Sequence, residues 1–141
     1  MATTIRPGSI ADLKALVAFD EIAAIEEARR DQIERGLRKG EVSVVDVDGM
    51  PKAYALLHHH FYGRPFLELL YVSAECRRSG LGVALVEHLQ TLVQPGALFT
   101  STNESNAPMR ALLRRLGFEA SGVIHNLDPG DPELVFFKRA P

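Results

Sequence analysis

The sequence has 141 residues, of which 46% are hydrophobic and 24% charged, the usual composition of a globular domain with a buried core. Its 16 basic and 18 acidic residues give a formal net charge of −2, which argues against a general nucleic-acid binder. With no apolar run long enough to span a membrane, no signal-peptide pattern and a single cysteine, the sequence predicts one cytoplasmic domain over residues 1–141.

The N-terminal part of the sequence predicts a short strand followed by two helices. Residues 3–7 are rich in β-formers, and Ser9 and Asp12 have the spacing of a capping box. Apolar residues at helical spacing follow from Leu13 onward. A second helix is expected over about residues 25–39, where Gly40 is suited to end it.

The periodicity then changes to that of strands. Residues 41–47 alternate and are β-branched, and residues 52–62 form a second run after the turn sequence DGMP. Residues 66–72 are apolar on both faces apart from Glu68. We therefore expect this third strand in the centre of a sheet.

The C-terminal part alternates helices and strands. Leucines three or four residues apart predict a helix from residue 81 to the Pro95-Gly96 pair. Asn106 is expected to cap a last helix, with Pro108 in its first turn. Strands are expected at residues 97–101, 118–124 and 133–139. The order of elements is that of a mixed sheet covered by helices.

The segment Arg77-Arg78-Ser79-Gly80-Leu81-Gly82 lies between a predicted strand and a predicted helix. The first N–H groups of a helix have no partner within it, and the helix dipole adds positive potential there. Glycines let an anion approach the backbone, and guanidinium groups match phosphate oxygens. The segment lacks both the Gly-Lys-Ser/Thr of a P-loop and the third glycine of a dinucleotide fingerprint. The segment is therefore either an ordinary tight turn or a site for a phosphate group.

This segment resembles the pyrophosphate signature Gln/Arg-x-x-Gly-x-Gly/Ala of the GNAT superfamily of acyl-CoA-dependent N-acetyltransferases. A second family signature, an Asn, a helix and then Gly-Phe, is matched by Asn106 and Gly117-Phe118. The order of elements also matches along nearly the whole chain. The resemblance implies an α/β (α+β) fold of the GNAT type. Its mixed, largely antiparallel central sheet would have about seven strands, splayed between the fourth and fifth and covered by about four helices.

The resemblance also implies the reaction and the cofactor site. An acetyl group would pass from acetyl-CoA to a primary amine by direct attack in a ternary complex, without a metal ion. Backbone groups near Leu70 and Val72 would pair with the pantetheine arm and the acetyl carbonyl, and Asn106 would contact the cofactor. Backbone amides would hold the pyrophosphate at Arg77, Arg78, Ser79, Gly80, Leu81, Gly82 and Val83.

The catalytic acid and base are less directly indicated. In many family members a Tyr four residues before the Gly-Phe pair protonates the leaving thiolate, but that position is Leu113 here. Tyr71 and Tyr62 are candidate replacements, and water is another proton source. Glu68 is the candidate base, since it is the only charged side chain in its strand and can accept a proton directly or through water. The alternative is a carboxylate that faces solvent or pairs with an arginine.

The tract His58-His59-His60 looks like a metal site, but consecutive strand residues alternate faces, so the three cannot converge on one ion. His58 and His60 share a face. They either contact the substrate and relay protons, or are ordinary polar residues near the end of a strand. An acyl-enzyme route through Cys76 is disfavoured because no histidine is near it in the sequence.

The acceptor is not identified by the sequence. The resemblance places its site around residues 20–35, 58–66 and 122–134, which does not separate a polyamine or aminoglycoside from an amino acid or a protein N-terminus. A non-catalytic acyl-CoA-binding module, suggested by Leu113, and a protein that binds another nucleotide remain alternatives. We expect no nucleic-acid or membrane partner, and a possible homodimer through the C-terminal strands.

Overall fold

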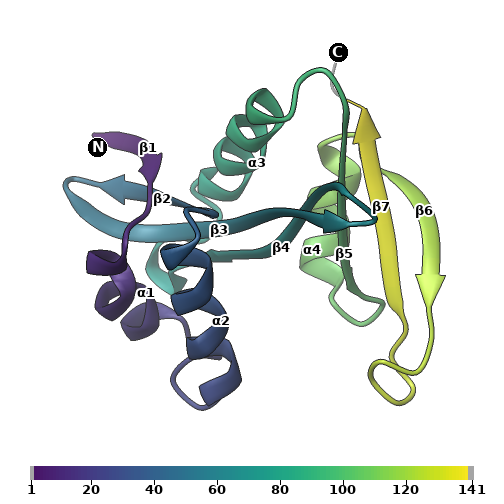
Figure 1. Cartoon of the computed structure of the whole chain (residues 1–141), viewed down its shortest axis with the longest axis horizontal. Helices are drawn as coiled ribbons and strands as arrows, with labels where there is room; N and C mark the ends of the chain where they lie inside the picture. The colour runs from purple at the N-terminus through teal and green to yellow at the C-terminus, as the bar shows by residue number, and fades with distance from the viewer. Residues whose placement is uncertain (1, 140–141) are drawn as a thin grey trace. The chain divides into compact units, whose positions relative to one another are not determined.

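The computed structural model describes residues 2–139 (Figure 1). None of the described helices is long and apolar enough to cross a membrane. The predicted elements are all present, with ends within a few residues of those expected. The helices are α1 (Leu13–Phe19), α2 (Glu27–Arg38), α3 (Leu81–Leu92) and α4 (Ala107–Arg115). The strands are β1 (Thr3–Pro7), β2 (Val42–Val47), β3 (Met50–Phe61), β4 (Arg64–Val72), β5 (Ala97–Asn103), β6 (Glu119–Ile124) and β7 (Glu133–Arg139).

The strands form one seven-stranded ladder in the order β1-β2-β3-β4-β5-β7-β6. β4 and β5 are parallel and are paired only at Phe66–Phe99 and Leu67–Thr100. By contrast, the antiparallel pairing of β5 with β7 extends from Ala97–Arg139 to Asn103–Glu133. The mixed, largely antiparallel sheet, with its shortened pairing between the fourth and fifth strands, confirms the predicted fold class.

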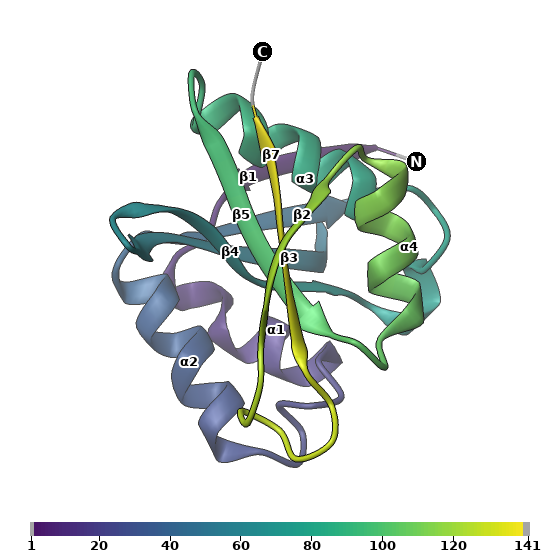
Figure 2. The same cartoon turned by 90° about the vertical axis from the view of Figure 1, so that its right-hand side faces the viewer.

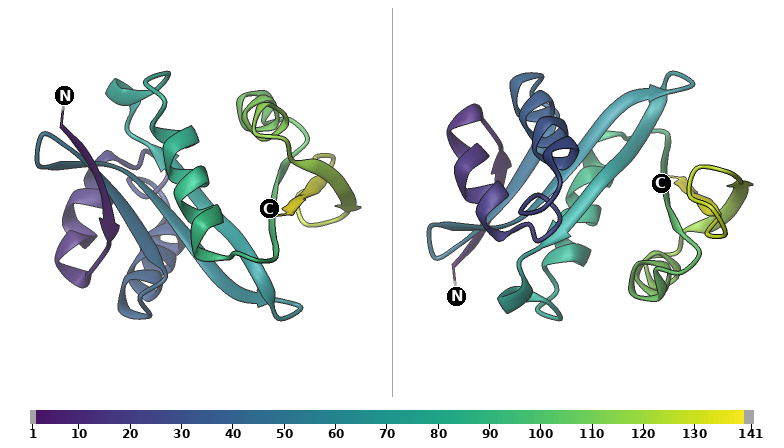
Figure 3. Two further views of the ribbon diagram at one scale, coloured as in Figure 1. Left: turned by 90° about the horizontal axis from the view of Figure 1, so that it is seen from above. Right: turned by 90° about the horizontal axis from the view of Figure 1, so that it is seen from below.

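The described residues divide into two compact units. One comprises the chain up to Leu57 together with Leu69–Leu89, and the other comprises His58–Glu68 together with the chain from Gln90 onward. In the first unit, α1 and α2 lie on one side of β1–β3 and α3 on the other (Figure 3). The apolar faces of α1 and α2 meet the sheet in a core of Leu16, Ala23, Ile33, Leu37, Val42, Val44, Tyr54 and Leu56.

A buried carboxylate orders the chain between α1 and α2. Asp20 is fully buried, and its Oδ1 accepts the backbone N–H groups of Ile22 (2.9 Å) and Ala23 (3.1 Å). The Tyr54 hydroxyl donates to its Oδ2 at 2.6 Å, and Arg29 Nε lies 3.9 Å from the same oxygen. Burial, and then the hydrogen bond to Asp20, hold the pKa of Tyr54 well above its usual range. These contacts make Tyr54 a structural residue.

A second ionic cluster joins β1 to the start of α1. Arg6 donates to both carboxylate oxygens of Asp12 (2.9 and 3.0 Å) and also to Asp46 (2.6 Å). Asp12 Oδ2 in turn accepts the Ser9 backbone N–H at 2.9 Å, the contact expected of the predicted capping box. The hydrogen bonds from Arg6 lower the pKa of Asp12 below its usual value.

The second unit is built on β5, β7 and β6, with β7 in the middle (Figure 2). Leu98, Thr100 and Thr102 on one face of β5 are buried, whereas the alternate residues are half-buried. The Thr100 hydroxyl donates to the Leu67 carbonyl at 2.8 Å and ties β5 to β4. All of β6 is exposed, so this edge strand packs against β7 alone.

Candidate active site

The loop between β4 and α3 has the geometry of an anion site. Arg78 (φ 65°) and Gly80 (φ 85°) both adopt left-handed conformations that turn the chain into α3. The N–H of Ala84 donates to the Gly80 carbonyl at 3.0 Å. Within the described chain, no acceptor is found for the N–H groups of residues 78–83. These donors are at a helix N-terminus, where an anionic group is stabilised.

The two arginines of this loop differ in what they contact. Arg77 lies back on β4, where its Nε donates to the Val72 carbonyl (3.2 Å) and its Nη2 to the Tyr71 hydroxyl (3.0 Å). Its guanidinium also lies 5.4 Å from the centre of the Tyr71 ring. Arg78 is exposed. Both arginine side chains were predicted to bind phosphate. The contacts of Arg77 show that its side chain also holds the end of β4 in place.

Tyr71, a predicted substitute acid, is held at its oxygen by two donors. The backbone N–H of Glu21 and the Nη2 of Arg77 both reach that oxygen at 3.0 Å. Because the oxygen accepts in both contacts, the hydroxyl proton is still available for donation. Tyr62, the other candidate, is 90% exposed, and its recorded contact is with the Phe61 ring.

Glu68, the predicted base, has a histidine beside it. His58 Nε2 lies 3.2 Å from Glu68 Oε1, and the two side chains are 14% and 34% exposed. The other ring nitrogen of His58, Nδ1, accepts the His60 backbone N–H at 2.9 Å. In the neutral ring the proton is therefore on Nε2, the nitrogen that faces Glu68. The rings of His58 and His60 stack at 5.5 Å, which confirms that they share a face.

Asn106 and Leu113 occupy the positions of the second signature. Asn106 caps α4, as predicted, and its Oδ1 accepts the Met109 backbone N–H at 3.2 Å. This leaves its amide nitrogen as a donor. Leu113, in the place of the usual family acid, is fully buried. An apolar core side chain at this position cannot protonate a thiolate.

The sequence matches the model of the acetyltransferase (GNAT) family over residues 12–118. The chain belongs to this family. The resemblance to the GNAT family that the sequence predicted is thus confirmed over most of this chain. A comparison with curated protein sequences found no significant match.

Solved structures agree with this assignment. The chain is 30% identical to a GNAT-family acetyltransferase from Bacillus cereus, with a TM-score of 0.90 and coverage of 100% of this chain and 99% of that one. It is 25% identical to the ribosomal-protein-alanine N-acetyltransferase of Brucella melitensis (TM-score 0.76; 96% and 99% covered). It shares its fold with yncA from Salmonella typhimurium, which was solved with its cofactor acetyl-CoA (19% identity, TM-score 0.78; 100% and 95% covered).

The structure brings some of the predicted site residues of this GNAT chain together and adds others. Tyr71, Val72 and Arg77 form one hydrogen-bonded group, which the sequence did not indicate. The contact of His58 with Glu68 was also missed, although the shared face of His58 and His60 was a partial signal. Among the described residues, no group of three or more metal-ligating side chains is placed to hold an ion.

Proposed function

We propose that this GNAT chain is a single N-acetyltransferase domain that transfers the acetyl group of acetyl-CoA to a primary amine. The observation that carries the proposal is the row of N–H groups at residues 78–83, where β4 leads into α3, for which the described residues provide no backbone acceptor. The same fold in yncA is solved with acetyl-CoA. The 30% identity to the Bacillus cereus acetyltransferase over the full chain supports the same family activity.

The binding groups follow from this arrangement. The N–H groups from Arg78 to Val83 hold the pyrophosphate, and the Arg78 guanidinium supplements them. The N–H of Arg77, which lies 3.5 Å from the Ala74 carbonyl oxygen, is assigned to the same site and would have to give up this long contact. The backbone at Leu70 and Val72 contacts the acyl arm, and the free amide nitrogen of Asn106 contacts the cofactor. Arg77 fixes the Val72 carbonyl, so its side chain positions this part of β4.

The chemistry uses two side chains of β4. Glu68 takes the proton of the acceptor ammonium group, and His58 orients the carboxylate. The freed nitrogen lone pair forms a bond to the thioester carbonyl carbon, and the nitrogen then releases its second proton to solvent. The carbon–sulfur bond then breaks, and the leaving thiolate takes a proton from the Tyr71 hydroxyl, which is returned from solvent. Backbone N–H groups stabilise the charge that develops on the carbonyl oxygen.

The direct test is release of CoA thiol from acetyl-CoA across a panel of amines that includes polyamines, aminoglycosides, amino acids and peptides. We expect turnover with at least one class and an acetylamide product of the corresponding mass. Tight binding of ATP but not of CoA in calorimetry would instead assign the loop to another nucleotide.

A second candidate function, a non-catalytic acyl-CoA-binding module, is favoured by one observation. The usual acid position is a fully buried leucine. This alternative predicts CoA binding without acetylation of any amine, and no change in thiol release on Glu68→Gln. The amine panel therefore separates the two functions.

The proposed partners are an amine acceptor and a second copy of the chain, with the cytoplasm as the proposed location. Support for a dimer is the exposed edge strand β6, on which Val123 and Ile124 are 52% and 40% exposed. Light scattering of the purified protein measures this state directly.

A further inference from the structure

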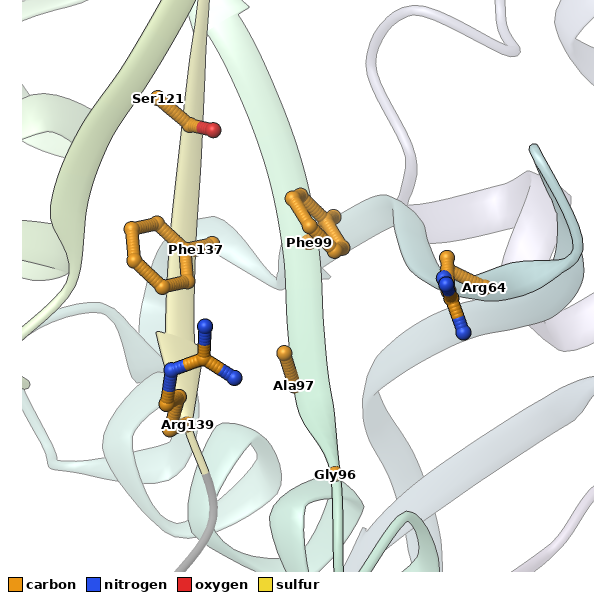
Figure 4. A pocket seen from close by; sticks show the side chains of 7 residues that line it. All are labelled: Arg64, Gly96, Ala97, Phe99, Ser121, Phe137 and Arg139. Carbon is orange, nitrogen blue, oxygen red and sulfur yellow. The ribbon is translucent and has the colours of Figure 1, made fainter.

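The second unit contains a pocket of about 470 Å³ on the open face of β5 and β7 (Figure 4). Phe99 and Phe137 line it, with their ring centres 5.9 Å apart, and Ser121 of β6 contributes a hydroxyl. Figure 4 shows Arg64 and Arg139 on opposite sides of this aromatic lining. The pocket thus combines an apolar interior with two guanidinium groups.

The positive charge of Arg64 and Arg139 makes this pocket suitable for an anionic ligand. Among the described residues, no carboxylate is recorded in contact with the guanidinium of Arg64 or Arg139, and Arg139 lies 5.7 Å from the centre of the Phe137 ring. Glu119 is paired with Phe137 in register but does not line the pocket. Two arginines at the edge of a pocket lined by stacked rings suit a carboxylate or phosphate carried by an apolar or aromatic body.

A continuous row of rings leads from this pocket to Glu68. The row consists of Phe137, Phe99, Phe61 and Phe66, in that order. The centres of neighbouring rings lie 5.9 Å (Phe99–Phe137), 5.4 Å (Phe61–Phe99) and 4.7 Å (Phe61–Phe66) apart. At its near end the Phe66 ring stacks on His58 at 5.5 Å, and His58 contacts Glu68. The proposed base and the cationic pocket are therefore the two ends of one surface.

The strand itself gives the length of this surface. Arg64 and Glu68 are four residues apart on β4, about 13 Å at the usual rise of 3.3 Å per residue. The amine and carboxylate of a free α-amino acid are far too close together to reach both ends. In an extended peptide, three residues advance about 10 Å. An acidic residue at the fourth position therefore starts about 10 Å from the first, and its side chain can cover the remaining distance.

We propose that the pocket between Arg64 and Arg139 selects the acceptor. It takes a primary amine whose anionic group lies about 10 to 13 Å from the nitrogen, with an apolar segment between them. The chemistry fits a peptide N-terminus with apolar second and third residues and an acidic residue at position four. This inference rests on the proposed acetyltransferase function, since it places the reacting amine at Glu68.

The test compares peptides that differ only in one charge. C-terminally amidated Ala-Phe-Phe-Glu-Gly-Gly is measured against its Gln and Lys counterparts, by thiol release and by direct binding in the presence of CoA. We expect the Glu peptide to be preferred by about tenfold or more in kcat/KM and in affinity. In Arg64→Gln/Arg139→Gln we expect this preference for the Glu peptide over the Gln peptide to disappear. 4-(4-Aminobutyl)benzoic acid and its benzamide repeat the comparison with a small molecule and show which source of the acid is used.

The matched control is Arg38→Gln, which removes an exposed arginine of α2 that forms an ion pair with Glu34 and should keep the acid preference. Equal use of the Glu and Gln probes by the unaltered protein would overturn the proposal. So would a preference that survives in the double variant, or a double variant that changes only the oligomeric state. Absence of acetylation with the preference in binding intact would contradict the proposed function and still support the pocket. Acetylation without a preference for the acidic peptide would support the proposed function and contradict the proposed role of the pocket.

Discussion

Asp20 and Glu68 are both carboxylates with a ring side chain beside them, Tyr54 in one case and His58 in the other, but their surroundings differ. Asp20 is fully buried and accepts hydrogen bonds from two backbone N–H groups and from the Tyr54 hydroxyl. The Glu68 side chain is one-third exposed, and its recorded ionic contact is with His58.

The difference separates structural roles from chemical ones. A buried carboxylate that already accepts three hydrogen bonds from the protein fixes its neighbours and is not reached by a ligand. A carboxylate that has an oriented histidine beside it and access to solvent can exchange a proton with a bound amine. Substitutions at the two carboxylates should therefore affect different quantities, the free energy of unfolding at Asp20 and the rate of acetyl transfer at Glu68.

The largest expected effect is on folding. Asp20→Ala leaves Tyr54, Arg29 and two backbone N–H groups without their acceptor inside the first unit. We expect the free energy of unfolding to fall by about 3–5 kcal/mol. Urea denaturation measures the change, and Asp20→Asn, which keeps one acceptor oxygen, should cost less. A loss below about 1 kcal/mol would show that the cluster does not organise this region.

The next effect is on catalysis alone. Glu68→Gln keeps the shape of the side chain but removes its basicity, so we expect kcat/KM to fall by about a hundredfold or more. Because the residue is exposed, the free energy of unfolding should stay within about 0.5 kcal/mol. The control is Glu87→Gln on the exposed face of α3, for which both quantities should be unchanged. An unaltered rate in Glu68→Gln would remove Glu68 from the mechanism.

The contrast between these clusters also shows what the sequence reveals. Helix and strand periods, with Gly and Pro at their ends, predicted every element, and the two family signatures predicted their order. These signals are local, since each depends on a few consecutive side chains. The Asn106 cap was predictable for the same reason.

The parts of the site that were missed depend on contacts between distant residues. Asp20 meets Tyr54, and Glu21 meets Tyr71, only because α1 packs on the sheet. The sequence placed His58 and Glu68 on adjacent strands, but not in the register that brings them to 3.2 Å. Pairing register is set by long-range packing and turn geometry.

A pair of tyrosines sharpens the comparison. Tyr54→Phe removes a donor from buried Asp20, so unfolding should become easier by roughly 1–3 kcal/mol, with no specific change in the rate of acetyl transfer. Tyr71→Phe removes the proposed acid and should lower kcat by about tenfold or more, with a smaller effect on stability. Both are read from denaturation and thiol-release curves of the same samples. The reverse pattern would exchange the roles assigned to the two hydroxyls.

The smallest effect concerns Asp12, a carboxylate whose exposure lies between those of Asp20 and Glu68. Asp12 is 8% exposed, and its pKa is lowered from 3.8, chiefly by hydrogen bonds from Arg6. A lowered pKa means that the native state favours the charged form. Its contribution is therefore complete above about pH 5 and is lost as the pH falls below 3.8 through the lowered value.

We expect Asp12→Asn to cost about 1 kcal/mol at neutral pH, since Arg6 is partly exposed and solvent screens the pair. The difference in unfolding free energy between the two proteins, measured from pH 6 down to pH 2, should shrink toward zero at the acid end. A difference that is independent of pH would mean that Asp12 acts through its size and the Ser9 hydrogen bond, and not through its charge. Asp12 would then resemble Asp20, a carboxylate whose main role is to order the backbone.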